Sequence, residues 1–475
     1  MKAKSRRQGK RTSALAPGGA VRDIIGNRNF RLLWTGEGIS LIGDQFYLVA
    51  LPWLVLRLTG SAFAMGTVLA LVAIPRALFM LPGGALTDRL SPRVVMLGSN
   101  LGRLVLVATL GALTLTGVIE LWMIYVFALF FGLADAFFFP AQSSMVPRLI
   151  GHDRLQTGNA IIQGTAQLSM FIGPALAGVL IATLDGGASG AAVHDLRGIG
   201  LAFALDAFSF LASITALALM RLDRRQAAVA TRGTVLSSIA EEFAVIRKDR
   251  VLRYYFLLIA AVTFFITGPF SVGVPVLAHT RFSGGAAAFG IILSAFGGGS
   301  LVGVLVAGFS PRPSARRFPA LMLGLPALIG VNMMLLGIAP AVAPAAMAAT
   351  VMGLAQGYVV IQFITWLQER TPPEMLGRTM SLLMFAVVGL APLSSAVAGA
   401  LIQVSVTAVL VGAGMFIVGV VTVGAVSPSV WRMGTASEPQ GEYSSTPTTG
   451  AGSSALADAR SKAALARKPP CDQVD

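Results

Sequence analysis

The sequence has little of the chemistry that metalloproteins and many soluble enzymes use. Its 475 residues include a single cysteine, Cys471, and three histidines, which fall in three different predicted loops. A lone cysteine excludes an internal disulfide and a cysteine-based metal site. We therefore expect no bound metal, no cofactor and no catalytic residues of an enzyme.

Charged residues are also scarce. They make up 12% of the chain, against about 25% in a typical soluble protein, while hydrophobic residues make up 55%. The apolar residues form about a dozen runs of around twenty, the length that crosses a hydrocarbon layer of about 30 Å. This composition excludes a soluble enzyme, a disordered protein and a disulfide scaffold, and it predicts an all-α membrane protein.

Twelve transmembrane helices are predicted. We expect them at 31–57, 62–86, 94–117, 121–144, 158–184, 199–220, 253–278, 286–309, 318–339, 343–367, 378–403 and 405–427. Basic residues favour the loops of one side, because only Arg57, Arg197 and Arg281 fall in loops of the other. By the positive-inside rule, both termini are cytoplasmic. The expected location is the cell inner (plasma) membrane, crossed many times.

The net charge of +15 follows the same pattern and does not indicate a nucleic-acid partner. Basic residues gather in the N-terminal tail and the cytoplasmic loops, where they orient the protein and contact anionic lipids. The tail leads into a full-length span without a small-residue cleavage site, so we do not interpret it as a cleavable signal. Membrane lipids are expected partners, and a monomer is the default.

The predicted organisation has five parts. They are a basic cytoplasmic tail (1–30), an N-terminal six-helix bundle (31–220), a cytoplasmic linker (221–252), a C-terminal six-helix bundle (253–427) and a disordered cytoplasmic tail (428–475). Apolar residues recur at helical spacing over 235–246 of the linker, which favours an amphipathic surface helix, although a plain connection remains open. The last part is rich in Ser, Thr, Gly, Ala and Pro, as disordered segments are.

The two halves repeat one another. Gly132-Leu133-Ala134 returns as Gly353-Leu354-Ala355 and Gly178 as Gly399, both at an offset of 221, while Gly66 and Gly84 correspond to Gly290 and Gly308 at an offset of 224. Each match is weak alone because glycine is abundant, but together they indicate duplication. Two pseudo-symmetric bundles that rock about a site at their interface are typical of transporters.

Between the second and third spans the chain reads Gly84-Ala85-Leu86-Thr87-Asp88-Arg89-Leu90-Ser91-Pro92-Arg93. This motif resembles the signature loop of the major facilitator superfamily. Gly84 allows two helices to approach closely, and Asp88 can bind a helix N-terminus or an arginine. With Arg89 and Arg93, these residues form a candidate gating loop. Arg312 takes the place of Asp88 in the corresponding loop of the second half.

Further motifs narrow the resemblance to the bacterial macrolide-efflux and enterobactin-exporter branch, over about residues 27–430. They are Asn29-Phe30-Arg31-Leu32-Leu33-Trp34, Gly43-Asp44, Phe139-Pro140-Ala141 and Pro373-Glu374-Met375-Leu376-Gly377-Arg378. The resemblance implies the major facilitator fold and an exporter of drugs or siderophore-like metabolites.

The fifth span contains Gly173-Pro174-Ala175-Leu176-Ala177-Gly178, which is similar to the Gly-Pro motif of drug–proton antiporters. A Gly-Pro pair kinks a helix, so Gly173, Pro174 and Gly178 are candidates for an antiporter-like kink. The arginine that such antiporters have in the fourth span is replaced by Ala128. A proton route must therefore use other residues.

Six ionisable residues lie within the predicted spans, all in the N-terminal half: Glu37, Asp44, Arg76, Arg103, Asp135 and Asp206. A charge at mid-membrane costs at least ~2.5–3.5 kcal/mol on insertion scales and is a functional candidate by default. Similar depths predict two pairings, one of Arg103 with Asp135 and one of Asp44 with Arg76. For Asp206, the favoured interpretation is a position toward the outer surface.

Burial favours a neutral carboxyl group and a nearby arginine favours a charged one, so a carboxyl group subject to both can gain and lose a proton. We rank Asp44 first as proton carrier, Glu37 second and Asp135 third. Static ion pairs that hold the N-terminal half together remain the alternative. The C-terminal spans have only polar candidates for a substrate pocket: Asn332, Gln356, Tyr358 and Gln362. An acidic cavity beside aromatic groups favours lipophilic amines.

The sequence thus predicts a secondary active transporter that exports a lipophilic small molecule by proton antiport with alternating access. It has no Gly-x-x-x-x-Gly-Lys-Ser/Thr loop for ATP. An importer of a nutrient or lysolipid, and a non-transporting membrane sensor, remain open alternatives.

Overall fold

The computed structural model describes residues 17–150, 154–184, 196–221, 250–310, 313–314, 317–370, 383 and 387–426. The regular elements within these residues are α-helices. They are α1 (Pro17–Gly26), α2 (Arg28–Thr59), α3 (Ala62–Arg89), α4 (Pro92–Leu115), α5 (Leu121–Leu149), α6 (Leu155–Leu184), α7 (Arg197–Leu219), α9 (Arg250–Thr280), α10 (Gly285–Phe309), α11 (Arg317–Ile338), α12 (Val342–Arg370), α14 (Ala391–Ile402) and α15 (Val406–Val426).

Eleven of these helices are long and apolar enough to cross a membrane, and α14 is a shorter apolar helix of 12 residues. Of the expected span at 378–403, the structure describes residue 383 and residues 387–403, in which α14 is the short helix. Gly389 and Leu390 form a turn directly before α14, and Pro392 lies in its first turn, where a missing N–H breaks no helical hydrogen bond. The linker at 222–249 and the tail at 427–475, with the predictions made for them, lie outside the described residues.

Two predicted boundaries shift in the structure. The loop expected after residue 86 is helical as far as Arg89, because the stop signal comes later: the Ser91 hydroxyl accepts the backbone N–H of Val94 at 3.3 Å and caps α4. The predicted basic tail includes the helix α1, and Asn27 separates it from α2 by accepting the N–H groups of Asn29 and Phe30.

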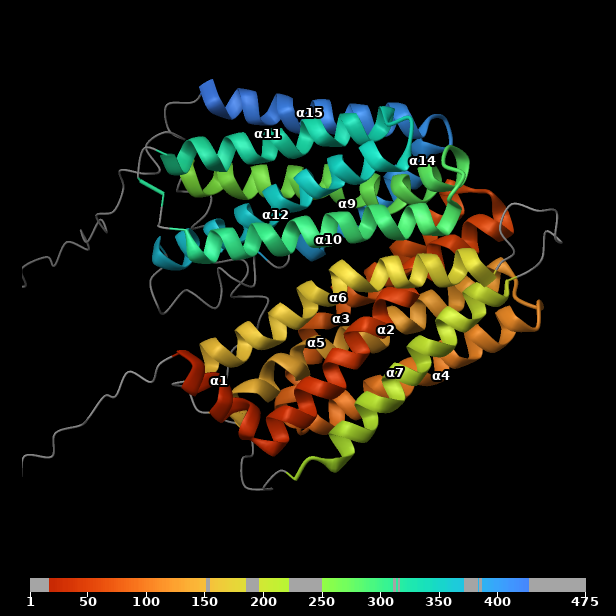
Figure 1. Cartoon of the computed structure of the whole chain (residues 1–475), viewed down its shortest axis with the longest axis vertical. Coiled ribbons are helices and arrows are strands. Elements are labelled where there is room, and N and C mark those ends of the chain that lie inside the picture. Colours follow the sequence, from red (N-terminus) through yellow and green to blue (C-terminus); the bar gives the residue numbers. More distant parts are fainter. Residues whose placement is uncertain are drawn as a thin grey trace, which may run out of the picture. The chain divides into compact units, whose positions relative to one another are not determined.

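The helices form two bundles, α2–α7 and α9–α15 (Figure 1). In each bundle a glycine permits a backbone contact. A side chain at Gly132 in α5 would collide with the carbonyl of Val72 in α3, and a side chain at Gly353 in α12 would collide with the carbonyl of Phe296 in α10. These two contacts are related by the same offsets as the sequence repeat. The duplication is therefore a repeat of backbone packing as well as of sequence.

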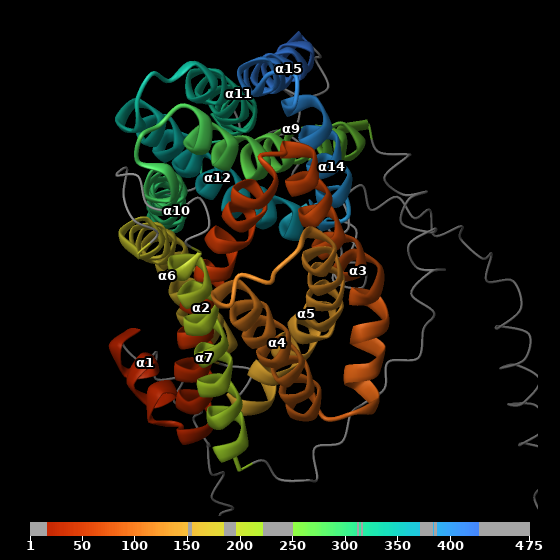
Figure 2. The same cartoon turned by 90° about the vertical axis from the view of Figure 1, so that its right-hand side faces the viewer.

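Glycines also line the contacts between the bundles. Gly66 in α3 meets Gly399 in α14, and Gly178 in α6 meets Gly290 in α10. Figures 1 and 2 both show α6 alongside α10, and Figure 2 shows α14 next to α3. The sequence repeat exchanges one contact for the other, so the interface has the pseudo-two-fold symmetry of the duplication.

Both glycine contacts lie toward one end of the helices, which we call the Gly60 end because α2 passes into α3 there; the opposite end is the Arg89 end. Two further contacts join the bundles at the Gly60 end. The Gln403 amide donates to the Ser61 hydroxyl at 3.1 Å, and the rings of Trp53 and His279 meet edge to face with centroids 5.4 Å apart. The bundles are thus held together at the Gly60 end.

These contacts predict the effect of adding side-chain atoms at Gly66. A Cβ there would lie 2.6 Å from the carbonyl oxygen of Ser395, so Gly66→Val should separate the bundles at the Gly60 end. Separation can be measured as disulfide formation between cysteines introduced at Ser61 and Gln403, after Cys471 is replaced by serine. We expect Gly66→Val to lower the yield several-fold.

Gly412 supplies the matched control, because a Cβ there would meet no atom within 4 Å. Gly412→Val should leave the yield unchanged. Equal yields in both variants, with both proteins folded in the membrane, would show that the glycine contact does not hold the bundles together.

Candidate functional site

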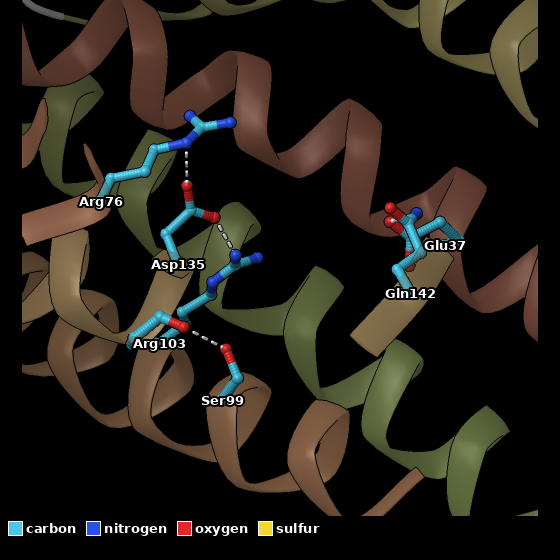
Figure 3. A network of polar contacts seen from close by, with 7 residues as sticks. Glu37, Arg76, Ser99, Arg103, Asp135 and Gln142 are labelled. Atoms are coloured by element: carbon cyan, nitrogen blue, oxygen red, sulfur yellow. Dashed lines mark hydrogen bonds and ion pairs between the residues drawn. The ribbon is translucent and has the colours of Figure 1, made fainter. Parts of the chain in front are cut away.

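An ion network around the buried Arg103 joins three helices of the N-terminal bundle. Asp135 of α5 accepts a hydrogen bond from Arg103 Nη2 of α4 with one oxygen, and its other oxygen lies 3.1 Å from Arg76 Nε of α3 (Figure 3). The Arg103 side chain is 3% exposed, whereas that of Arg76 is 43% exposed. The predicted pairing of Arg103 with Asp135 is confirmed.

The second predicted pairing, of Asp44 with Arg76, is wrong. Arg76 pairs with Asp135 instead, because the close contact of Val72 with Gly132 lies about one turn away on both helices and brings the two side chains together. Depth predicts the height of a residue but not the side of the helix on which it lies. Asp44 is partly exposed and forms no ion pair with any residue that the structure describes.

Arg103 is held by aromatic rings as well as by its carboxylate. Its guanidinium carbon lies 4.4 Å from the ring centroid of Phe138, 5.7 Å from that of Phe210 and 5.8 Å from that of Phe131. Cations over aromatic faces gain electrostatic stabilisation, most of all where water is excluded. The environment therefore fixes Arg103 in place.

Arg76 is arranged differently. It reaches Asp135 through Nε, and Figure 3 shows the two terminal nitrogens of its guanidinium directed away from Asp135. With two-fifths of its side chain exposed, Arg76 can exchange partners at lower cost than Arg103. The network thus combines one fixed cation with one that is more accessible.

Glu37 occupies a separate position on α2. Its Oε1 accepts a hydrogen bond of 2.6 Å from the Gln142 amide of α5, and the side chain is 5% exposed (Figure 3). Its other oxygen, Oε2, has no hydrogen-bond partner within the described part of the chain. Glu37 is seven residues from Asp44, two turns along one face of α2.

The prediction for Asp206 is wrong. Asp206 in α7 is fully buried, not near a surface, because α7 packs closely on α2. The contact depends on Gly43, where a Cβ would collide with Ser209 and lie 2.8 Å from Asp206 Oδ1. The sequence analysis names Gly43 only as part of the Gly43-Asp44 motif. Its role in the structure is to let α2 pack closely on α7.

Sequence reasoning also missed polar residues that connect the helices. Asn100 donates to the Ser213 hydroxyl at 3.0 Å, the Ser99 hydroxyl donates to the Ala134 carbonyl at 2.6 Å, and Gln142 binds Glu37. The sequence feature that could have identified them is a polar side chain within an apolar run. Such residues satisfy one another where the bilayer offers no water.

The candidate gating residues lie at the Arg89 end. Arg93 donates to the last carbonyl groups of α7, through Nε to Leu217 at 2.8 Å and through Nη2 to Ala218 at 2.7 Å. A cation at this position satisfies carbonyls that lack a partner in the helix. Gly84, Asp88 and Arg89 lie in the last turns of α3, but their side chains are outside the described residues, as is Arg312.

The antiporter-like motif lies where the bundles meet. The N–H of Ala175, directly after Pro174, donates to the Ser294 hydroxyl of α10 at 2.8 Å. Gly178 contacts Gly290, and a Cβ at Gly173 would lie 2.5 Å from the side chain of Gln45 in α2. The motif therefore connects α6 both to its own bundle and to the other one.

The C-terminal bundle contains a cavity of about 250 Å³ among α9, α11, α12 and the segment after residue 382. Its lining is mainly apolar, with Gln356, Thr263 and Thr267 as polar groups. Of the four predicted pocket residues, the structure places Gln356 on this cavity. Asn332 is buried and donates to the Leu328 carbonyl of its own helix; Gln362 is buried and Tyr358 half-buried elsewhere.

The part of the chain that the structure describes contains no group of three His, Cys, Asp or Glu residues that could hold a metal ion. Its distinctive features are long apolar helices, two repeated bundles and buried charges at membrane depth. Together these define a helical membrane transporter built from two parallel repeats.

The comparison with protein families agrees. The Major Facilitator Superfamily model matches residues 33–396. The chain belongs to this superfamily and is a multi-pass membrane transporter, not an enzyme.

Curated relatives include efflux proteins at low identity. The chain is 24% identical over 360 residues to macrolide efflux protein A of Streptococcus pyogenes, covering 74% of this chain and 84% of that protein. It is 28% identical over 370 residues to multidrug efflux pump Tap of Mycolicibacterium fortuitum, covering 76% and 85%.

Solved structures share the fold. A POT family transporter in complex with 5-aminolevulinic acid superposes with a TM-score of 0.66 at 12% identity, covering 85% of this chain and 97% of that one. A bacterial homologue of the iron transporter ferroportin, in an inward-facing state, gives 0.64 at 13% identity, covering 84% and 99%. At these identities the likeness concerns the fold alone.

The ion network predicts that Asp135→Asn and Arg76→Gln lower the free energy of unfolding by different amounts. Asp135→Asn leaves the buried Arg103 without its anion, and breaking a buried pair in this way costs about 3 kcal/mol of unfolding free energy. Arg76→Gln removes a cation that is partly solvated, for which we expect less than about 1 kcal/mol. Unfolding in mixed SDS and detergent micelles, followed by tryptophan fluorescence, measures both.

The double variant Asp135→Asn with Arg103→Gln is the control, because it removes both buried charges and should recover part of the lost stability. If Asp135→Asn proves no less stable than Arg76→Gln, the network does not stabilise the bundle as described.

Proposed function

We propose that the protein exports a lipophilic small molecule, a drug or a siderophore-like metabolite, by proton antiport with alternating access. The observation that carries the proposal is that the two bundles differ in chemistry. The N-terminal bundle contains the buried carboxylates, and the C-terminal bundle contains a mainly apolar cavity. The efflux activity in the names of two relatives supports the direction of transport.

The orientation that we propose for the protein in the plasma membrane rests on its basic loops. The positive-inside rule puts the Arg89 end and both termini in the cytoplasm. The glycine contacts at the Gly60 end then close the transporter toward the outside. In this conformation a substrate is taken up from the cytoplasm, and outward release requires both glycine contacts to open.

Among the proton-coupling candidates, the geometry favours Asp44 and Glu37 over Asp135. Asp135 is held by two arginines, an environment that keeps a carboxylate charged. Asp44 is partly exposed without an ion pair in the described part of the chain, and Glu37 has one oxygen without a hydrogen-bond partner. Asp135, Arg103 and Arg76 then act as a structural network beside the carriers.

The substrate class follows from the same division. A cavity lined by aliphatic and aromatic side chains, with the Gln356 amide and two threonine hydroxyls as polar groups, suits a lipophilic molecule with few polar atoms. Carboxylates in the other bundle attract a protonated amine. Macrolides combine these properties and are the first substrates to test.

The proposal predicts how macrolide accumulates in an efflux-deficient bacterium. Cells that express the wild type should retain less radiolabelled macrolide than cells without it, and an uncoupler should remove the difference. Asp44→Asn should retain as much macrolide as cells without the transporter, because its side chain cannot release a proton. Accumulation is measured by filtration and scintillation counting.

Asp23→Asn is the matched control, because Asp23 is an exposed carboxylate paired with Arg154 at 3.2 Å, far along the chain from the network. It should export like the wild type. Higher accumulation in wild-type cells would instead indicate an importer, and binding without any change in accumulation would indicate a sensor. Uncoupler-sensitive export by Asp44→Asn would remove Asp44 as the carrier.

A further inference from the structure

A second carboxylate lies close to Asp44, buried in the bundle. Asp206 is fully buried, and its Oδ2 has no hydrogen-bond partner among the described residues. A charged carboxylate in this position would be strongly destabilising unless paired. The protonation state of Asp206 is therefore constrained by what surrounds it.

The neighbouring hydroxyl gives only weak support to a charge on Asp206. Ser209 Oγ donates its one proton to the backbone carbonyl of Asp206 at 2.7 Å. Its distance of 3.4 Å to Asp206 Oδ1 is long for a hydrogen bond between oxygens. The hydroxyl proton is therefore directed mainly to the backbone carbonyl, which leaves the Asp206 side chain with one weak contact to Ser209.

No cation compensates Asp206 directly. Within the described residues, the ion pairs of this bundle core use Arg103 and Arg76 on Asp135. The charged and titratable groups that face Asp206 are Asp44 and Tyr47 on α2 and Arg103 on α4. Arg103 is the one cation in this set, and it is committed to Asp135.

Asp44 and Asp206 belong to turns of α2 and α7 that are in contact. Gly43, directly before Asp44, is the point at which α2 touches Asp206 and Ser209. Two like charges held together in a low-dielectric interior cannot both persist without a cation between them. One carboxyl group of the pair is therefore protonated.

Tyr47 completes the cluster. It lies one turn after Asp44, is 8% exposed and stacks on Phe131 with ring centroids 4.2 Å apart. Its hydroxyl has no hydrogen-bond partner in the described part of the chain. Tyr47 lies one turn beyond Gly43 on the same face of α2 and its ring meets Phe203 of α7 with centroids 6.0 Å apart, so it adds a buried hydroxyl that can both donate and accept a proton on the side that packs on α7.

We propose that Asp206 is a buried proton-binding residue that exchanges its proton with Asp44. In this conformation Asp206 is the acid and Asp44 is the carboxylate. In the transfer, the O–H bond of Asp206 breaks and an O–H bond forms on Asp44, so the pair keeps one negative charge throughout. The proposal rests on proton antiport and adds the residue that holds the proton while Asp44 is charged.

The first test measures protonation on the purified full-length protein without any substrate. A protonated carboxyl group gives an infrared C=O stretching band distinct from that of a carboxylate, and it reacts with dicyclohexylcarbodiimide. We expect the wild type at neutral pH to show the band and to be labelled at Asp206, and Asp206→Asn to lose both signals. A wild type without the band, or a band that persists in Asp206→Asn, would overturn the proposal.

Asp23→Asn is the matched control, because it removes an exposed carboxylate that pairs with Arg154 at 3.2 Å and leaves the partners of Arg103 unchanged. It should retain the band that Asp206→Asn loses. Because labelling is read on the wild type by mass spectrometry, the test does not depend on the stability of a variant. Label on Asp44 instead of Asp206 would reverse the assignment of acid and carboxylate and would also overturn the proposal.

The second test separates this inference from the proposed function. Proteoliposomes with an imposed proton gradient are loaded with labelled macrolide, and gradient-driven transport is compared among the wild type, Asp206→Asn and the exposed control Asp23→Asn. We expect Asp206→Asn to lose gradient-driven transport and Asp23→Asn to keep it.

If the wild type itself fails to respond to the gradient, proton antiport of macrolides is wrong, and the infrared result alone decides whether Asp206 binds a proton. If Asp206→Asn responds like the wild type, the exchange with Asp44 is wrong.

Discussion

The close approach of α3 and α5 at Gly132 determines the geometry of the N-terminal bundle. Helices in a bilayer gain nothing from burying apolar surface against one another, so they associate through close packing and polar contacts. Without a side chain at Gly132, the backbones come near enough for Arg76 and Asp135 to meet, and Arg103 then joins from α4. The ion network is thus a consequence of a backbone contact.

The same backbone contact recurs in the C-terminal bundle without the charges. Gly353 meets Phe296 as Gly132 meets Val72, yet the C-terminal spans have amides and hydroxyls where the N-terminal spans have carboxylates and arginines. Duplication therefore conserved the packing that builds a bundle while the chemistry at membrane depth diverged.

The sequence was sufficient for most of the fold and part of the site. Hydrophobic runs gave the spans, glycine spacing gave the repeat, and equal depth gave the pairing of Arg103 with Asp135. The partner of Arg76 and the burial of Asp206 could not be predicted, because they depend on how each helix is rotated about its axis. α7 is apolar nearly all round, so its own pattern does not show which side meets α2; Gly43, on the other helix, decides it. The turn at Gly389 and Leu390 before α14 could not be predicted either. An apolar run shows how long a span can be, but not whether its helix is continuous.

The glycine contacts between the bundles also bear on how the transporter moves. At Gly66 with Gly399, and at Gly178 with Gly290, backbone faces backbone with no side chains to interlock. Surfaces of this kind can part and meet again without any change of rotamer when, in the proposed alternating access, the bundles open at the Gly60 end. That opening also breaks the polar and aromatic contacts beside them, such as Gln403 with Ser61. Opening therefore costs packing and a few polar contacts at this end, but no rearrangement of side chains across the glycines.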